Sequence, residues 1–107
     1  MERTALLENV VAAALYRKHK EELYYLKGAK SDVDFYLSDS KVAIQVAYSL
    51  KNDVTYRREV ENLLSFASSS KEKHSLLIVT YEEEKTIVEG GYKIEVVPLK
   101  KFLLGQY

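Results

Sequence analysis

The chain has 107 residues, of which 47% are hydrophobic and 30% charged, as is typical of one globular domain. Its formal net charge is zero, so its overall charge gives no argument for binding nucleic acid. Without cysteine it can form no disulfide, zinc–thiolate site or cysteine nucleophile, and no apolar run approaches the roughly 20 residues of a membrane helix. We therefore expect a cytoplasmic protein without a membrane segment, folded as a single domain over residues 1–107.

The first predicted element is a helix over residues 4–20. Its apolar side chains recur at the spacing of one helix stripe: Leu6, Leu7, Val10, Val11, Ala14 and Leu15. Arg17, Lys18 and Lys20 gather at its carboxyl end, where the helix dipole favours positive charge. A solvated helix end is the simpler interpretation of this basic cluster, and a contact with a nucleic-acid backbone is the alternative.

A strand is predicted over residues 22–26 and a β-hairpin after it. Polar and apolar residues alternate over 32–37 and over 41–47, on either side of a short polar turn. If Asp39 and Ser40 form a two-residue turn, the pairing sets Asp34 directly opposite Gln45. The apolar side chains then share one face of the hairpin, namely Val33, Phe35, Leu37, Val42, Ile44 and Val46. A carboxylate and an amide therefore meet on the other face.

The same register sets Asp32 opposite Ala47. Asp32 is more simply a solvated acid at the start of a strand than a ligand. Six of the nine tyrosines, at 16, 24, 25, 36, 48 and 56, are either a stacking surface for single-stranded nucleic acid or ordinary amphipathic residues at the core rim.

The second half of the chain predicts a helix, two strands and a helical turn. Asn52, Asp53 and Thr55 are all good N-caps for a helix that ends near residue 68. Its apolar stripe is Val60, Leu63, Leu64 and Ala67, and Arg57, Arg58, Glu59 and Glu61 begin its solvated side. Residues 74–80 form a continuous apolar run, typical of a strand covered on both faces. An acidic turn over 82–84, a strand over 92–97 and a helical turn over 99–104 complete an α/β/α sandwich with a mixed sheet.

This order of segments resembles the PD-(D/E)XK restriction-endonuclease-like fold, and more closely a domain at the C-terminus of prokaryotic and archaeal AAA-type P-loop ATPases. The segments that carry the resemblance lie between residues 6 and 104: LENVVAAALYR, YYLKGAKSDVDFYL, AIQVAYSL, TYRREVENLL, LLIVTYEEE and IEVVPLKKFLL. The sequence has no Walker A pattern, so the resemblance implies the nuclease-like module alone, with an ATPase domain as its partner.

The resemblance also implies a site. In nucleases of this fold an aspartate and a second acid hold Mg²⁺ or Mn²⁺, a lysine two residues later prepares the water, and a glutamate on the first helix often joins them. These positions correspond to Asp34, Gln45, Ala47 and Glu8. Gln45 still offers a carbonyl oxygen, a ligand type that Mg²⁺ accepts, but Ala47 offers no group that can activate water.

A cation from elsewhere would have to replace the missing lysine, and Lys51, Arg57 and Arg58 are the nearest candidates. The resemblance thus predicts a catalytically degenerate nuclease-fold domain that acts as a nucleic-acid- or protein-interaction module of an ATPase, without a certain cofactor. One alternative is an active Mg²⁺- or Mn²⁺-dependent endonuclease with a migrated basic residue. The other is an oligomerisation module that forms a homodimer through a sheet edge or helix face.

Overall fold

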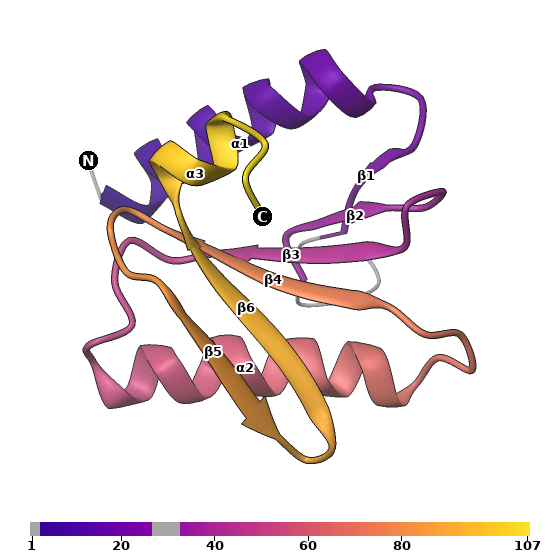
Figure 1. The fold of residues 1–107 in the computed structure, drawn as a ribbon, viewed down its shortest axis with the longest axis vertical. Helices are drawn as coiled ribbons and strands as arrows, with labels where there is room; N and C mark the ends of the chain where they lie inside the picture. The colour runs from indigo at the N-terminus through magenta and orange to yellow at the C-terminus, as the bar shows by residue number, and fades with distance from the viewer. Residues whose placement is uncertain (1–2, 27–32) are drawn as a thin grey trace.

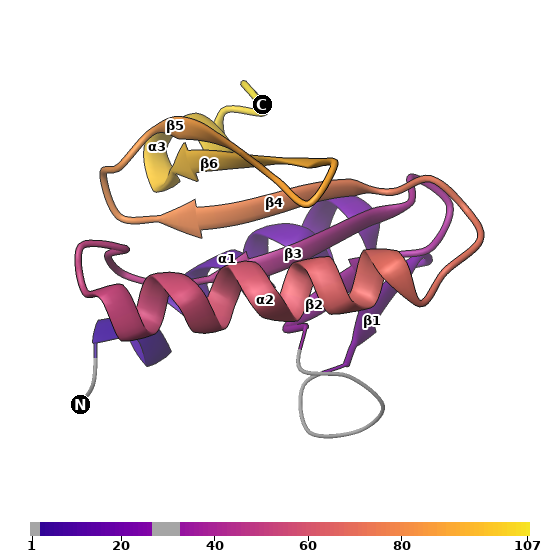
Figure 2. The same cartoon turned by 90° about the horizontal axis from the view of Figure 1, so that it is seen from below.

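The computed structural model describes residues 3–26 and 33–107, so Asp32 lies outside the described residues. The described chain forms three helices and six strands: α1 (Arg3–His19), β1 (Leu23–Tyr25), β2 (Phe35–Leu37), β3 (Val42–Val46), α2 (Asp53–Ser68), β4 (Ser75–Thr80), β5 (Lys85–Glu89), β6 (Tyr92–Pro98) and α3 (Leu99–Leu103). The strands build one sheet in the order β1-β2-β3-β4-β6-β5 (Figure 1). Figure 2 shows α2 on one face of this sheet, with α1 and α3 on the other.

The sheet is mixed. β3 pairs with β4, and β4 with β6, in parallel, whereas β1–β2, β2–β3 and β5–β6 are antiparallel. Helix α2 is the crossover between β3 and β4, as a parallel pair of strands requires. The α/β/α sandwich with a mixed sheet, predicted from the sequence, is confirmed.

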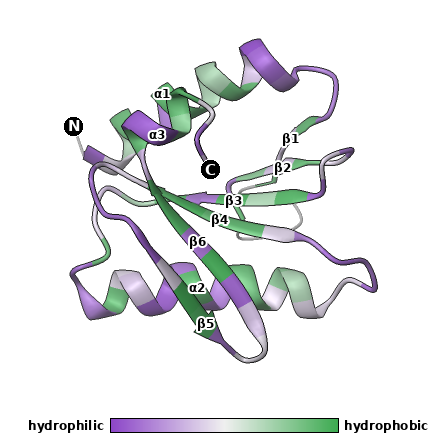
Figure 3. Cartoon of the chain, in the orientation of Figure 1, coloured by the Kyte–Doolittle hydropathy of each residue, from purple (hydrophilic) through white to green (hydrophobic). Residues whose placement is uncertain are grey.

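Two apolar clusters hold the layers together. Between the sheet and α1 with α3, the cluster includes Val11, Ile44 and Val79; between the sheet and α2, it includes Val60, Leu63 and Ile78. β4 lies at the centre, and every residue from Leu76 to Thr80 is buried. Figure 3 shows the resulting hydrophobic colouring along β3, β4 and β6. The apolar run over residues 74–80 therefore forms a strand that is covered on both faces, as predicted.

Helix α1 buries a narrower stripe than its sequence indicates. Leu7, Val11, Ala14 and Leu15 are buried as predicted. Leu6 and Val10, predicted to belong to the same stripe, are 52% and 43% exposed. The apolar pattern covers more of the helix circumference than the sheet can contact, so one edge of the stripe remains in solvent.

β5 was not predicted. No element was expected between the acidic turn over 82–84 and the strand over 92–97, and β5 lies in that interval. In the structure β5 forms a hairpin with β6 around Gly90 and Gly91, whose φ angles are +60° and +83°. Positive φ at both central residues is what a type I′ turn requires, and glycine adopts it without a steric cost. This hairpin makes β5 one edge of the sheet.

The β2–β3 hairpin has the predicted register, because Leu37 pairs with Val42 and Phe35 with Ile44. The predicted two-residue turn is wrong: residues 38–41 all lie in the turn, and Lys41 has a φ of +57°. The predicted face of Val33 is also wrong. The chain bends before β2, so Val33 joins the cluster on the α2 side instead of the cluster that contains Phe35.

Candidate functional site

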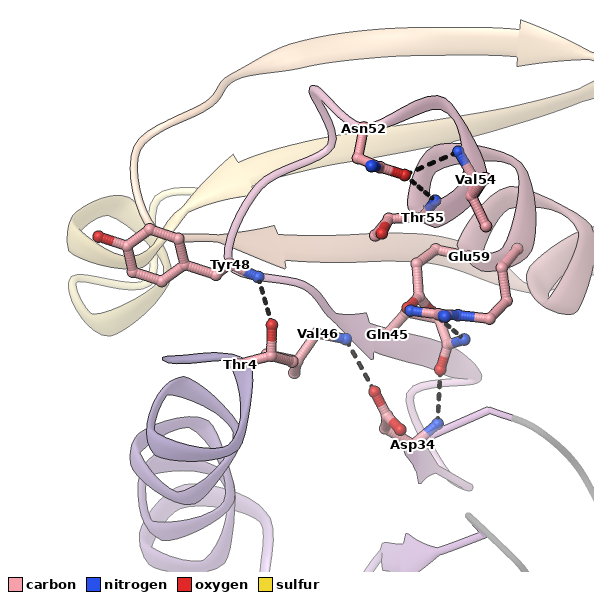
Figure 4. Close-up of polar contacts among 10 residues, drawn as sticks. Thr4, Asp34, Gln45, Val46, Tyr48, Asn52, Val54, Thr55 and Glu59 are labelled. Atoms are coloured by element: carbon pink, nitrogen blue, oxygen red, sulfur yellow. Dashed lines mark hydrogen bonds and ion pairs between the residues drawn. The ribbon is translucent and has the colours of Figure 1, made fainter. Parts of the chain in front are cut away.

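A polar cleft of about 720 Å³ lies where the amino-terminal ends of α1 and α2 approach the end of β3. Its lining comes from α1 (Arg3, Thr4, Glu8), from the start of β2 and the end of β3 (Asp34, Val46, Ala47, Tyr48, Ser49) and from α2 (Thr55, Arg58, Glu59, Asn62). Asn52 caps α2 beside it, since its side-chain oxygen accepts hydrogen bonds from the backbone N–H groups of Val54 and Thr55 at 2.9 and 3.1 Å. Figure 4 shows this cap, together with Thr4, Asp34, Val46, Tyr48 and Glu59 of the cleft lining.

Asp34 and Gln45 meet here as the hairpin register predicts. The Gln45 side-chain oxygen accepts a hydrogen bond from the backbone N–H of Asp34 at 2.7 Å. The Asp34 carboxylate accepts one from the backbone N–H of Val46 at 2.9 Å (Figure 4). Asp34 is 6% exposed and Gln45 only 1%, so both interactions are shielded from water.

Glu59 is the third member of this buried polar group, and the sequence analysis placed it wrongly on the solvated side of α2. It is only 7% exposed, and its Oε1 accepts a hydrogen bond from the Gln45 amide nitrogen at 2.8 Å. Glu59 lies one helical turn before the buried Leu63, so the spacing of the apolar residues in α2 indicates that Glu59 is on the buried face.

Two of these side chains, Asp34 and Gln45, complete the sheet where ordinary strand pairing stops. The β2–β3 ladder ends at the pair of Phe35 and Ile44. Beyond it, the N–H groups of Asp34 and Val46 have side-chain acceptors where another strand would have supplied carbonyl oxygens. Buried backbone donors need such partners, so this polar group has a structural role in the hairpin and in docking α2.

Ala47, which the resemblance predicts to stand in place of a lysine, presents a buried methyl group. Ala47 is 1% exposed, belongs to the apolar cluster under α2, and donates its N–H to the Val79 carbonyl at 3.1 Å. It therefore contributes no polar side-chain atom to the cleft, although it forms part of its wall.

The three candidate replacement cations are placed differently. Arg58 lines the cleft, and its Nη2 lies 3.3 Å from Oε2 of Glu59. Arg57 instead pairs with Glu89 of β5 at 2.7 Å, and neither Arg57 nor Lys51 lines the cleft. Arg3, which the sequence analysis did not single out, is a second cation of the cleft wall, with its guanidinium 5.3 Å from the centre of the Tyr48 ring.

Glu8 and Asp34, two of the three predicted metal ligands, line the same cleft. The third, Gln45, has its carbonyl oxygen in the hydrogen bond to Asp34. Across residues 3–26 and 33–107, no three His, Cys, Asp or Glu residues are grouped so that they could hold a metal ion. Metal binding by Glu8, Asp34 and Gln45 therefore stays a prediction.

The basic cluster of Arg17, Lys18 and Lys20 is exposed at the opposite end of α1. Arg17 lies fourteen helical steps after Arg3, which is roughly 20 Å along the helix axis. The two basic regions therefore cannot contact the same phosphate group.

The six tyrosines also divide. Tyr16, Tyr24 and Tyr25 are exposed, whereas the other three are partly buried. Tyr36 illustrates the second group: it packs on Phe66 and its hydroxyl lies 2.8 Å from Nε2 of His74.

No family model, no curated protein and no solved structure matches this chain. Of the helices formed by the described residues, none is both long and apolar enough to cross a membrane. The protein is an α/β/α sandwich with a buried group of Asp34, Gln45 and Glu59 where the pairing of β2 with β3 ends.

Proposed function

We propose that this chain is a catalytically degenerate nuclease-fold domain that acts as an interaction or regulatory module of a P-loop ATPase. The main support for this proposal is the hydrogen bonding of the Gln45 side chain. Both polar ends of this side chain, at a position that nucleases of the fold reserve for a metal-binding acid, are engaged in buried hydrogen bonds. The apolar environment of Ala47 supports the same conclusion, because no group there could prepare a water molecule.

A cleavage assay tests the proposal. The domain is incubated with duplex, single-stranded and branched DNA and with RNA, in Mg²⁺ or Mn²⁺, beside an Asp34→Asn variant that keeps an acceptor for the Val46 N–H. We expect no metal-dependent cleavage by either protein. Cleavage by the wild-type protein that Asp34→Asn abolishes would overturn the proposal.

Manganese titration followed by NMR reports metal binding without requiring a substrate. In a degenerate site, Mn²⁺ at millimolar concentration should cause no saturable line broadening confined to Asp34, Gln45 and Glu8. Localised, saturable broadening that disappears in Asp34→Asn would show that the site still holds a cation.

One observation favours an active endonuclease as the second candidate: Arg58 lines the cleft and contacts the buried Glu59. A guanidinium can bind a phosphate or orient a water molecule, but it stays protonated and cannot act as a general base. If the domain cleaves nucleic acid, Arg58→Ala should therefore remove activity, and Arg57→Ala, in the neighbouring arginine outside the cleft, should not.

Nucleic-acid and protein interaction are distinguished by fluorescence anisotropy with labelled duplex and single-stranded DNA. Binding that weakens with added salt and is lost when Arg17, Lys18 and Lys20 are replaced by alanine would assign the module to nucleic acid. The same replacements at Lys71 and Lys73, two exposed lysines after α2, provide the control for a general loss of positive charge.

A further inference from the structure

The nuclease resemblance does not explain the open edge of β5. Among the strands of residues 3–26 and 33–107, β5 ends the sheet and has β6 as its one neighbour. Val88, near its middle, is 74% exposed, more than any other exposed large hydrophobic side chain in the described part of the chain. An unprotected edge strand with an exposed apolar side chain is a template for pairing with another strand.

The hairpin geometry determines which backbone groups face outward. Glu89 and Tyr92 flank the two-residue Gly90–Gly91 turn, so they form a hydrogen-bonded pair, and hydrogen-bonded pairs alternate along the strands. Glu89, Ile87 and Lys85 therefore direct their N–H and C=O groups toward β6. Thr86 and Val88 direct theirs toward the open edge.

The side chains of β5 are complementary to themselves in an antiparallel pairing. Lys85 and Glu89 stand at its two ends on the same face as Ile87, which is buried against the α2 side. A second β5 that runs in the opposite direction, centred on Ile87, sets Lys85 opposite Glu89 at both ends. The same register pairs Thr86 with Val88, so the outward backbone groups meet each other.

Other registers lose this match. If the pairing is centred on Thr86 or on Val88, the backbone bonds remain. In each case one charged side chain lies opposite Ile87, and the other lies outside the paired strands. A parallel arrangement brings like charges together at each end, which is unfavourable. Only the register centred on Ile87 satisfies both the backbone and the charges.

We propose that β5 is a homodimerisation edge, at which a second copy of this chain adds its own β5 antiparallel across a two-fold axis and makes one continuous twelve-stranded sheet. The two-fold axis passes beside Ile87 and makes the interface isologous. Arg57, which pairs with Glu89 at 2.7 Å, and Tyr56, whose ring centre lies 5.2 Å from the Lys85 ammonium, flank the charged ends on α2. This inference does not depend on the proposed function.

Sedimentation velocity over a range of concentrations tests the proposal on the full chain. A single pair of five-residue strands is a small interface, so we expect a dissociation constant on the order of 0.1–1 mM. The weight-average mass should rise from 12.3 kDa toward twice that value. A mass that stays at the monomer value throughout would overturn the proposal.

Charge reversal identifies the edge. Lys85→Glu and Glu89→Lys each place like charges opposite one another at both ends, and each should weaken dimerisation about 10- to 100-fold. An equimolar mixture of the two variants restores opposite charges at both ends, so a heterodimer should form where neither variant associates alone. Lys93→Glu makes the same charge change at an exposed residue of β6 and is the control. This variant should dimerise with the same dissociation constant as the wild-type protein.

Thr86→Pro provides an independent variant. It removes an N–H that faces the open edge, at a position where edge strands tolerate proline, and leaves the backbone bonds between β5 and β6 in place. It also removes the Thr86 hydroxyl, which donates to the Glu95 carboxylate of β6 at 2.9 Å, and Thr86→Val serves as the control for that loss. Thr86→Pro should abolish dimerisation with an unchanged circular dichroism spectrum. Dimers that survive Thr86→Pro and both charge reversals would place the interface on another surface and refute the assignment to β5.

Discussion

Replacement of Gln45 by methionine tests the structural role of the buried polar group. Methionine has nearly the same length and volume as glutamine but neither polar end. Gln45→Met therefore removes the acceptor for the Asp34 N–H at 2.7 Å and the donor to Glu59 at 2.8 Å, without opening a large cavity. Each buried group left without this partner costs about 1–3 kcal/mol. We expect unfolding free energy to fall by about 3 kcal/mol.

Urea denaturation followed by circular dichroism measures this loss. With a slope of about 1.5 kcal/mol per molar urea, the midpoint should move down by roughly 2 M. Gln106→Met, which makes the same change at an exposed residue near the C-terminus, should cost less than about 0.5 kcal/mol. A loss below about 1 kcal/mol for Gln45→Met would show that the two hydrogen bonds, one within the hairpin and one to α2, do not stabilise the fold.

Gln45→Glu separates the two bonds. It keeps an acceptor for the Asp34 N–H but brings a second carboxyl group to Glu59, and the pair raises the pKa of one of its members. An acid whose pKa is raised in the folded state stabilises the protein more as pH falls. The stability lost through Gln45→Glu should therefore shrink between pH 8 and pH 5, whereas the loss through Gln45→Met should not.

Two further predictions concern the hairpins. Gly91→Ala should lower the unfolding free energy by about 1–2 kcal/mol, since alanine is strained at a φ of +83°; Gly91→Asn should cost less, and equal losses in urea melts would contradict the backbone argument. The backbone hydrogen bond from Ser40 holds the pKa of Glu22 below its ordinary value. Glu22 therefore stabilises the fold above pH 4.5, and this contribution is lost as pH falls through the lowered pKa. Urea melts from pH 7 to pH 3 should show Glu22→Gln less stable than the wild type at neutral pH and equal to it at pH 3; a gap that stays constant would refute the assignment.

The sequence predicted the fold class and the meeting of Asp34 with Gln45 because both depend on simple periods. Alternation at period two fixes which residues are opposite each other in a hairpin, whatever the turn between them. The turn was predicted at the right place but with the wrong length, since its four residues contain no glycine and the left-handed position falls on Lys41. The bend that turns Val33 to the other face has no local sequence signal.

Charge concealed two features. Glu59 was assigned to solvent because it stands in a run of charged residues, although its spacing from Leu63 indicates the buried face. β5 was missed because it is short and has a charged residue at each end, Lys85 and Glu89. The alternation of Thr86, Ile87 and Val88 before two glycines is nonetheless a hairpin pattern that could have identified it.

The buried links between β2, β3 and α2 join neighbours in the chain. The bond from Val46 to Asp34 spans 12 positions and that from Gln45 to Glu59 spans 14, so closing these loops costs little entropy. The hairpin and α2 should consequently form early and open as one cooperative unit in the native state. The amide proton of Val46, held by a carboxylate, would then exchange with water only when that whole unit opens.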